Sequence, residues 1–288
     1  MNKCFVVDFL LFENCEMTPK QKYLLDLNGY LHIPPVLTSN QLKTAQLAVD
    51  RCINTPEEKL TTSRNFAFDK SLETLALHPK TFSIIKALTD NKPRLNRGTL
   101  AINTHEQNKI TQLHCAREDC GWQTRGYLVK NAKIFCNDIV VFFYFTDVLS
   151  GDGGLVVLPG SHKSEFERPP DLFFPDLNDT KPQLHPALKN ITPKAGDAII
   201  LTELTTHGVL VWLPKDRDRR FLILRYKTQY FQDGRGHKQP FSDEIMAKLS
   251  EETKEWVEFS DYEHTKKLFK ENKLPFQVRL EIRISPFE

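Results

Sequence analysis

Two histidines of this sequence stand where their side chains could hold a metal ion. His114 ends a strand-like segment, 110–113, and His207 opens another at 208–213. Imidazole is the commonest metal-binding side chain, and two strands that enter the mouth of one β-barrel would bring both rings to one ion. The histidines alone are a weak signal, because a single histidine is more often a hydrogen-bonded structural residue. Their interpretation depends on the residues and elements around them.

A pair of arginines, Arg219 and Arg220, begins the next strand-like segment, 219–230. An arginine that points into an apolar interior is costly unless an anion meets it. The planar guanidinium suits a carboxylate that is held at two points. Alternation along a strand places the two side chains on opposite faces, and the sequence does not say which face is inside. Both could equally be surface charges at the end of a strand.

Helical signals occupy the N-terminal part of the chain and a segment near its end. Residues 18–28 are predicted to form a helix, with proline in its first turn and Asn-Gly at its end. Thr38 and the glutamine three residues later have capping-box spacing before an apolar stripe of helical period. Residues 71–90 are typical of two short helices broken at a His-Pro pair, and 241–273 is predicted to be helical.

The middle of the chain is predicted to be a β-rich core. Short runs of β-branched and aromatic residues alternate with glycine-rich turns, which is typical of a sandwich or barrel. The predicted strands are 100–103, 110–113, 134–149, 155–158, 198–201, 208–213 and 219–230, with a late strand within 274–288. We therefore expect helices that flank an antiparallel β core.

The composition excludes several classes of protein. The 288 residues include 39 basic and 37 acidic side chains, for a net charge of +2. Such a near-neutral balance argues against a dedicated nucleic-acid binder. Hydrophobic residues make up 40% and charged residues 26%, which is ordinary for a globular protein and excludes collagen, a coiled coil and wholesale disorder.

Neither a membrane span nor an export signal is visible. The longest apolar run, 139–145, is far shorter than the roughly 20 residues that a spanning helix needs. The apolar segment 5–12 contains Asp8 and has no small-residue cleavage site, so it is a poor signal peptide. We predict a cytoplasmic protein without a membrane partner. Its six scattered cysteines are predicted to be free thiols.

Several segments together resemble the phytanoyl-CoA dioxygenase family. The most specific is 153–163, with the sequence Gly-Gly-Leu-Val-Val-Leu-Pro-Gly-Ser-His-Lys. The Leu-His pair that ends at His114, the turn at 195–197, the Thr-His-Gly segment at 206–208 and the strand at 219–226 occur in the family's order and spacing. The resemblance spans roughly residues 23–226.

This resemblance implies a double-stranded β-helix, a jelly-roll or cupin-like barrel, that binds Fe(II) and 2-oxoglutarate. It implies that His114 and His207 are iron ligands and that Arg219 holds the far carboxylate of 2-oxoglutarate. The spacing from His207 is one residue longer than in the family, which leaves Arg220 as the alternative anchor. The implied enzyme uses molecular oxygen to oxidise a small organic molecule. We expect one domain, either monomeric or homodimeric, with an N-terminal helical part at 1–92, the core at 93–232 and a C-terminal extension at 233–288.

The chain departs from the family at the carboxylate ligand. The family has His-x-Asp or His-x-Glu, whereas this chain has His114-Cys115-Ala116. In the first of three interpretations, Glu118 or Asp119 folds back to the iron, with Glu106 as a more distant candidate, and the chain is an oxygenase.

Two other interpretations remain open. The 2-oxoglutarate-dependent halogenases resemble this family and carry His-x-Ala or His-x-Gly, where chloride takes the place of the carboxylate. Alternatively, the fold survives in a non-catalytic protein that binds a small molecule. Val209 slightly favours that alternative, because relatives often have Ser or Thr there to contact the cosubstrate.

Overall fold

A computed structural model describes most of the chain. The described residues are 17–56, 64–106, 108, 110–120, 126–169, 176, 179–180, 183–229 and 240–257, without the side chains of 119 and 120. The apolar segment 5–12, residues 258–273 of the predicted C-terminal helical segment and the predicted strand within 274–288 lie outside them.

The first two long helices begin as their sequences predict. Helices α1 (Pro19–Asn28) and α2 (Ser39–Asn54) are each preceded by a threonine in a complete capping box, Thr18 and Thr38. Each threonine accepts a hydrogen bond from the backbone of a glutamine three residues later, and that glutamine's side chain returns to the cap. Helix α1 ends at Gly29, whose φ of 78° favours glycine.

The other helices are short. The break predicted at the His-Pro pair is present, because α4 begins at its proline. These helices are α3 (Lys70–Glu73), α4 (Pro79–Leu88), α5 (Ala116–Cys120), α6 (Asp243–Lys248) and α7 (Glu251–Glu255), with 3-10 turns at Phe66–Phe68, Thr74–Leu77 and Ser161–Lys163. Among the described residues, none of the helices is both long and apolar enough to cross a bilayer.

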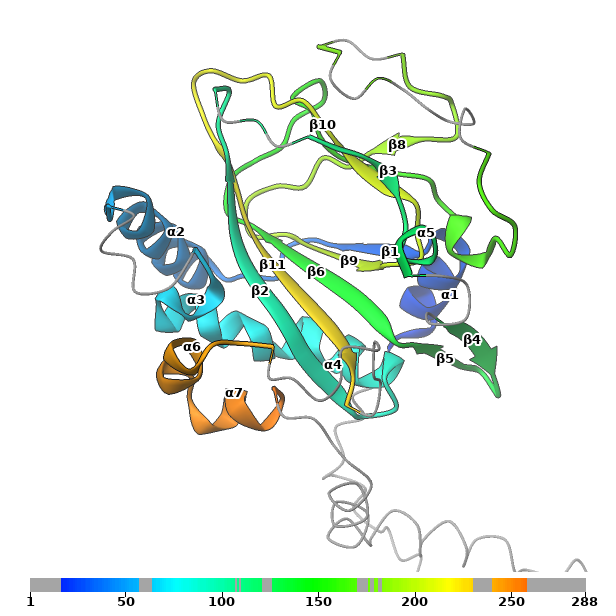
Figure 1. Cartoon of the computed structure of the whole chain (residues 1–288), viewed down its shortest axis with the longest axis horizontal. Helices are drawn as coiled ribbons and strands as arrows, with labels where there is room; N and C mark the ends of the chain where they lie inside the picture. The colour runs from blue at the N-terminus through cyan, green and yellow to red at the C-terminus, as the bar shows by residue number, and fades with distance from the viewer. Residues whose placement is uncertain are drawn as a thin grey trace, which may run out of the picture.

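The strands form two facing antiparallel sheets and one separate hairpin (Figure 1). The five-stranded sheet has the order β1 (Tyr30–Ile33), β9 (Ala198–Thr202), β6 (Asp138–Tyr144), β11 (Arg219–Thr228), β2 (Pro93–Asn103). The four-stranded sheet has the order β3 (Thr111–His114), β10 (His207–Leu210), β7 (Gly154–Val157), β8 (Lys189–Asn190). The hairpin pairs β4 (Tyr127–Lys130) with β5 (Lys133–Cys136).

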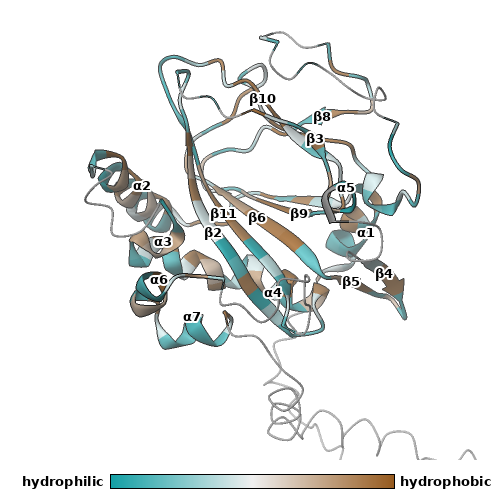
Figure 2. Cartoon of the chain, viewed as in Figure 1, coloured by the Kyte–Doolittle hydropathy of each residue, from teal (hydrophilic) through white to brown (hydrophobic). Residues whose placement is uncertain are grey.

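The five-stranded sheet is buried on both faces. On its helix-covered face, Val141 and Phe143 pack into one cluster with residues of α2, α3 and α4. On its inter-sheet face, Phe142 and Tyr144 pack into a second cluster with residues of β7. Burial on both faces explains the unbroken apolar run at 139–145, and β6 is hydrophobic along most of its length (Figure 2). The expected sheet-rich fold with flanking helices is confirmed.

The structure differs from the sequence expectations in several details. The segment 134–149, predicted as one strand, is divided at residue 137 into β5 and β6, and β2 begins at Pro93 instead of residue 100. The N-terminal part, expected to be helical, contributes β1, which pairs with β9 at the edge of the five-stranded sheet. The five-stranded sheet therefore includes residues on both sides of the boundary at residue 93 that we expected between the N-terminal part and the core. Strand β10 ends at Leu210, before the predicted end at 213. Strands this short show too little periodicity to be delimited from the sequence, because their pairing partners decide where they end.

Candidate metal centre

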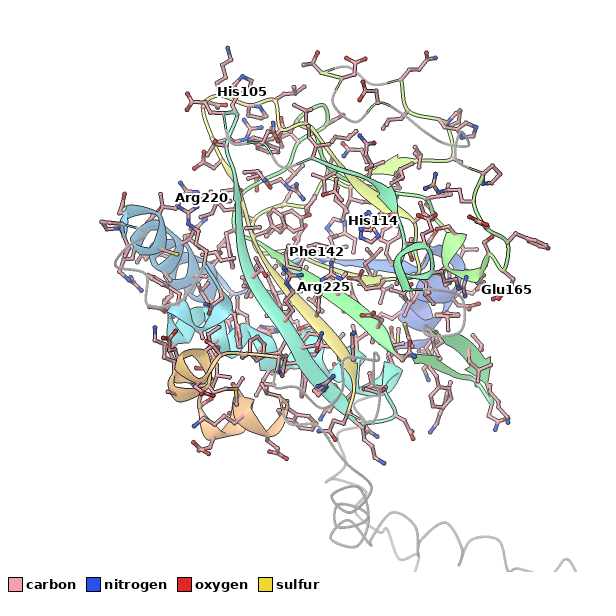
Figure 3. All side chains as sticks on the ribbon, in the orientation of Figure 1. His105, His114, Phe142, Glu165, Arg220 and Arg225 are labelled. Carbon is pink, nitrogen blue, oxygen red and sulfur yellow. The ribbon has the colours of Figure 1, made fainter. Side chains whose placement is uncertain are left out.

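The two histidines singled out in the sequence face one another across neighbouring strands. His114, the last residue of β3, pairs with His207, the first residue of β10. Their ring centroids are 4.3 Å apart, and Figure 3 shows His114 directed toward the inter-sheet space. The antiparallel pairing of β3 with β10 thus brings together two side chains that lie far apart in sequence.

Both imidazole rings are held in the orientation that a metal ligand needs. Nδ1 of His114 lies 2.9 Å from the carbonyl oxygen of Gln112, and Nδ1 of His207 lies 2.7 Å from that of Thr205. A carbonyl oxygen only accepts hydrogen bonds, so each Nδ1 donates its proton to it, and in the neutral ring Nε2 then keeps a lone pair. This backbone contact fixes the tautomer of metal-binding histidines.

Burial also favours the neutral form of His207. Its side chain is 5% exposed, and removal from water lowers its pKa, an effect that the negative charge of Glu203 partly opposes. A neutral imidazole is the form that binds a metal ion. The two rings therefore have the tautomer, and His207 the charge state, that fit a divalent cation.

The segment 153–163, which gives the strongest resemblance in sequence, holds the start of β10. Ser161 Oγ accepts a hydrogen bond from the backbone N–H of Thr206 at 2.8 Å, and Thr206 precedes His207. Gly153 has a φ of 99°, and a Cβ there would lie 1.8 Å from the carbonyl oxygen of Val211. No other residue type fits at this turn. The motif therefore positions the second histidine and supplies no ligand itself.

Arg219 carries a buried positive charge on the inter-sheet face. Its side chain is 1% exposed, and its guanidinium carbon lies 4.2 Å from the ring centroid of Phe221. Nη2 is 3.5 Å from the hydroxyl of Tyr144, and Nε has no hydrogen-bond partner among the described residues. No described carboxylate forms an ion pair with it. Because a buried unpaired charge is costly, this site fits an anionic ligand.

The adjacent arginine has its own partners. Arg220 Nη1 lies 2.7 Å from Oδ1 of Asp50, and Nη2 lies 3.0 Å from Oδ2 of Asp218. Figure 3 shows Arg220 on the side of α2, away from His114. The sequence left the two arginines as alternatives, and the geometry favours Arg219 as the one that meets an anion between the sheets.

The carboxylates predicted as third ligands are not gathered around the histidines. Glu118, in α5, forms a two-pronged ion pair with Arg168, with N–O distances of 3.0 and 3.3 Å. Glu106 is exposed, and the side chain of Asp119 is not described. Within the described residues, no group of three or more His, Cys, Asp or Glu side chains is arranged to hold a metal ion. The roles of Glu118 and Asp119 as ligands remain predictions.

An ion pair that the sequence reasoning did not single out lies in the same inter-sheet space, with its carboxylate buried and its guanidinium partly exposed. Glu203, four positions before His207, is 4% exposed, and its Oε1 lies 2.6 Å from Nη1 of Arg225. Alternation along β11 was the available signal, because it places Arg225 on the same face as Arg219. A lone glutamate between two apolar strands was the second signal.

A cavity of about 240 Å³ lies beside the two histidines without being lined by them. Its wall includes Cys115 and Thr206, the sequence neighbours of His114 and His207, together with Leu158 and residues 164 and 166–169. The histidines point between the sheets, and their neighbours line this outer cavity.

Comparisons with known proteins identify a fold but no family. No protein-family model matches the chain, and no curated protein matches its sequence. Among solved structures, HygX from Streptomyces hygroscopicus with nickel and 2-oxoglutarate bound is 21% identical with a TM-score of 0.62, covering 76% of this chain and 90% of HygX.

Two further solved structures come from nogalamycin biosynthesis. The non-heme alpha-ketoglutarate-dependent carbocyclase SnoK has 16% identity and a TM-score of 0.55, and covers 82% of this chain and 92% of its own. The corresponding epimerase SnoN has 16% identity and a TM-score of 0.54, and the match covers 75% of this chain and 86% of SnoN. The chain therefore shares its fold with iron- and 2-oxoglutarate-dependent enzymes.

Proposed function

We propose that this chain is an Fe(II)- and 2-oxoglutarate-dependent dioxygenase that oxidises a small organic molecule. The observation that carries this function is the pair of facing histidines, His114 and His207, with both Nε2 atoms free for a metal. The buried guanidinium of Arg219, which lacks a described carboxylate partner, supplies a second binding group between the same sheets.

The residues present fit the cofactors by their donor chemistry. His114 and His207 would hold Fe(II), for which imidazole is a suitable ligand. Bound iron with 2-oxoglutarate supplies the oxidative decarboxylation that activates molecular oxygen. The chain itself holds each Nδ1–H on a backbone carbonyl, which leaves Nε2 as the nitrogen that would bind the metal.

Arg219 would bind the carboxylate of 2-oxoglutarate that is remote from the metal. The rings of Phe221 and Tyr144 lie against its guanidinium, at 4.2 and 5.9 Å from their centroids. Apolar walls exclude water and strengthen a charge–charge contact. A Cβ at Gly154 would lie 3.3 Å from Arg219 Nε, so glycine at this position leaves room for the guanidinium.

The finer assignments follow from the same site. The two facing sheets support a double-stranded β-helix, and the segment 153–163 supports membership of the phytanoyl-CoA dioxygenase family. A small-molecule substrate is supported by HygX, whose structure has been solved with nickel, 2-oxoglutarate and hygromycin B bound. The same proposal includes a cytoplasmic location.

An anaerobic titration tests this function. The native protein is titrated first with Fe(II) and then with 2-oxoglutarate, and we expect a visible charge-transfer band from the chelated 2-oxo acid. Replacing Arg219→Gln should weaken 2-oxoglutarate binding by about 100-fold, because removing one partner of a buried charge pair costs roughly 2–5 kcal/mol.

Arg220→Gln is the matched control, since Arg220 is paired with Asp50 and Asp218. It should leave the affinity for 2-oxoglutarate at the native value. A native protein that binds Fe(II) but shows neither the band nor any 2-oxoglutarate binding would overturn the dioxygenase assignment and favour the binding-protein alternative.

A further inference from the structure

The proposed centre has two histidines but no carboxylate at the expected position. Ala116 occupies it, at the start of α5, with its side chain buried. Two-histidine iron sites of this kind ordinarily include one carboxylate, whose negative charge partly neutralises the positive charge of the metal ion. A carboxylate from elsewhere in the fold could take this role only if it were buried, close to the histidines and firmly held at its backbone.

Glu203 meets these conditions. Its backbone carbonyl accepts a hydrogen bond from the N–H of Ala116 at 2.7 Å, so its main chain lies against the residue that lacks the carboxylate. Its own N–H donates to the carbonyl of Asp138 at 3.1 Å. These two bonds tie Glu203 to the segment that follows β3 and to the beginning of β6. Its side chain is 5% exposed.

Glu203 lies near both histidines through its place in the chain and its main-chain contact. It precedes His207 by four positions, and it accepts a hydrogen bond from Ala116, which follows His114 by two positions. A buried carboxylate at this place would stabilise a divalent cation bound by the two histidines.

Arg225 holds one of the two carboxylate oxygens. Its Nη1 lies 2.6 Å from Oε1 of Glu203, yet Oε1 makes no hydrogen bond of adequate geometry. The side chain of Arg225 is about a third exposed, and Figure 3 shows Arg225 beside Phe142 and in the direction of His114. A carboxylate has two oxygens with about four acceptor sites, so contact with Arg225 at Oε1 leaves Oε2 for a second partner.

The geometry points to Glu203 as the carboxylate ligand of the metal centre, replacing the one that Ala116 lacks. This inference rests on the proposed binding of Fe(II) by His114 and His207. In the described structure the carboxylate pairs with Arg225 and is not gathered with the two histidines around an ion. On metal binding, its second oxygen would turn toward them. The ligand then comes from the loop before the second histidine, and not from the segment after the first.

Metal binding by three single variants tests this assignment. Co(II) serves as an air-stable probe for Fe(II), and its dissociation constant is measured by competition with a chromophoric chelator, alongside its visible absorption spectrum. Glu203→Gln keeps the shape of the side chain but removes its charge. We expect it to weaken Co(II) binding by at least 10- to 100-fold, the range known for supporting residues of metal sites, and to change the spectrum.

Two control variants separate ligation from a structural role. Glu118→Gln removes the carboxylate that pairs with Arg168 and should bind Co(II) with native affinity and spectrum. Arg225→Gln breaks the ion pair but leaves the carboxylate, and should bind Co(II) as tightly as the native chain or more tightly, since a nearby positive charge repels the metal. A merely structural ion pair would instead make Glu203→Gln and Arg225→Gln behave alike.

The outcomes distinguish this inference from the proposed function. Native affinity in Glu203→Gln, or an equal loss in Arg225→Gln, overturns the assignment of Glu203 while leaving the proposed function standing. No Co(II) binding by the native chain overturns the proposed function itself. If Glu203→Gln does not fold, Glu203→Asp retains the charge but shortens the side chain, and native affinity and spectrum in that variant would overturn the assignment.

Discussion

Strands β6 and β11 present alternate side chains to two faces that differ in chemistry. On the helix-covered face, β11 places Leu222 and Leu224, both fully buried, and Tyr226, whose hydroxyl donates to the carbonyl of Ala76 at 2.6 Å. On the inter-sheet face, the same strand places Arg219 and Arg225. Tyr226 on the first face and Arg225 on the second have partners within the chain, whereas Arg219 has no described carboxylate partner.

This difference separates residues that stabilise the fold from residues retained for binding. Burying apolar side chains contributes roughly 1.5–3 kcal/mol each. Burying a guanidinium such as that of Arg219 costs free energy unless an anion accompanies it. The inter-sheet face therefore holds one buried charge, that of Arg219, without a described carboxylate partner, and we propose an anionic ligand for it.

The largest expected effect is the loss of metal binding in His207→Ala. His207 is one of the two histidines proposed to hold the ion, so its removal should abolish Fe(II) and Co(II) binding in an anaerobic titration. His105→Ala is the control, because His105 is exposed (Figure 3), and should bind normally. Equal metal affinity in both variants would contradict the division between the two faces.

Leu224→Ala should affect stability and leave the metal site intact. Leu224 is 0% exposed on the helix-covered face, and truncating a buried leucine costs about 2–5 kcal/mol. Chemical denaturation should show this loss, with an unchanged dissociation constant for Co(II). Leu47→Ala, at a position that is 50% exposed, should change stability by less than about 0.5 kcal/mol. A large change in metal affinity in Leu224→Ala would argue against separate roles for the helix-covered face and the inter-sheet face.

Acidification should destabilise the scaffold of the second histidine through His162. This side chain is fully buried against Tyr127, and burial, with Lys163 nearby, lowers its pKa to about 4. The folded state accommodates only the neutral imidazole, so this stability is fully present above the unfolded-state pKa of about 6.5. As the pH falls toward 4, the free energy of unfolding should decrease by about 3 kcal/mol. Denaturation curves between these pH values measure the effect, and His162→Gln should flatten it. Equal pH dependence in both proteins would contradict this origin.

The smallest expected effect is that of the helix cap in Thr38→Ala. Thr38 Oγ1 accepts a hydrogen bond from the backbone of Gln41 at 3.2 Å, and losing such a cap costs about 1 kcal/mol. Thr44→Ala, in the interior of α2, should be neutral or slightly stabilising, because alanine has the higher helix propensity. A loss in Thr38→Ala no greater than in Thr44→Ala would show that the cap contributes nothing measurable.

Signals that are local in sequence predicted the helices and strands better than they predicted which strands pair with one another. The helix that begins after Thr18, the capping box at Thr38, the His-Pro break before α4 and the apolar run of β6 are decided by residues near in sequence, and the structure shows each of them. The capping box at Thr18 was not predicted. The edge strand β1 was missed as part of the sheet, because only its pairing with β9 makes it one. The sequence also suggested no partner for Glu203.

The sequence alone determined which residue types were available: two histidines at strand ends, an arginine pair, and an alanine where the family pattern that the sequence resembles has a carboxylate. Strand alternation divided Arg219 from Arg220 but could not say which faced inward. Only the tertiary structure decided that, by packing the inter-sheet face of β11 against the four-stranded sheet. It also joined Glu203 to Arg225 and His114 to His207, because contacts between distant segments depend on how the sheets pair and pack.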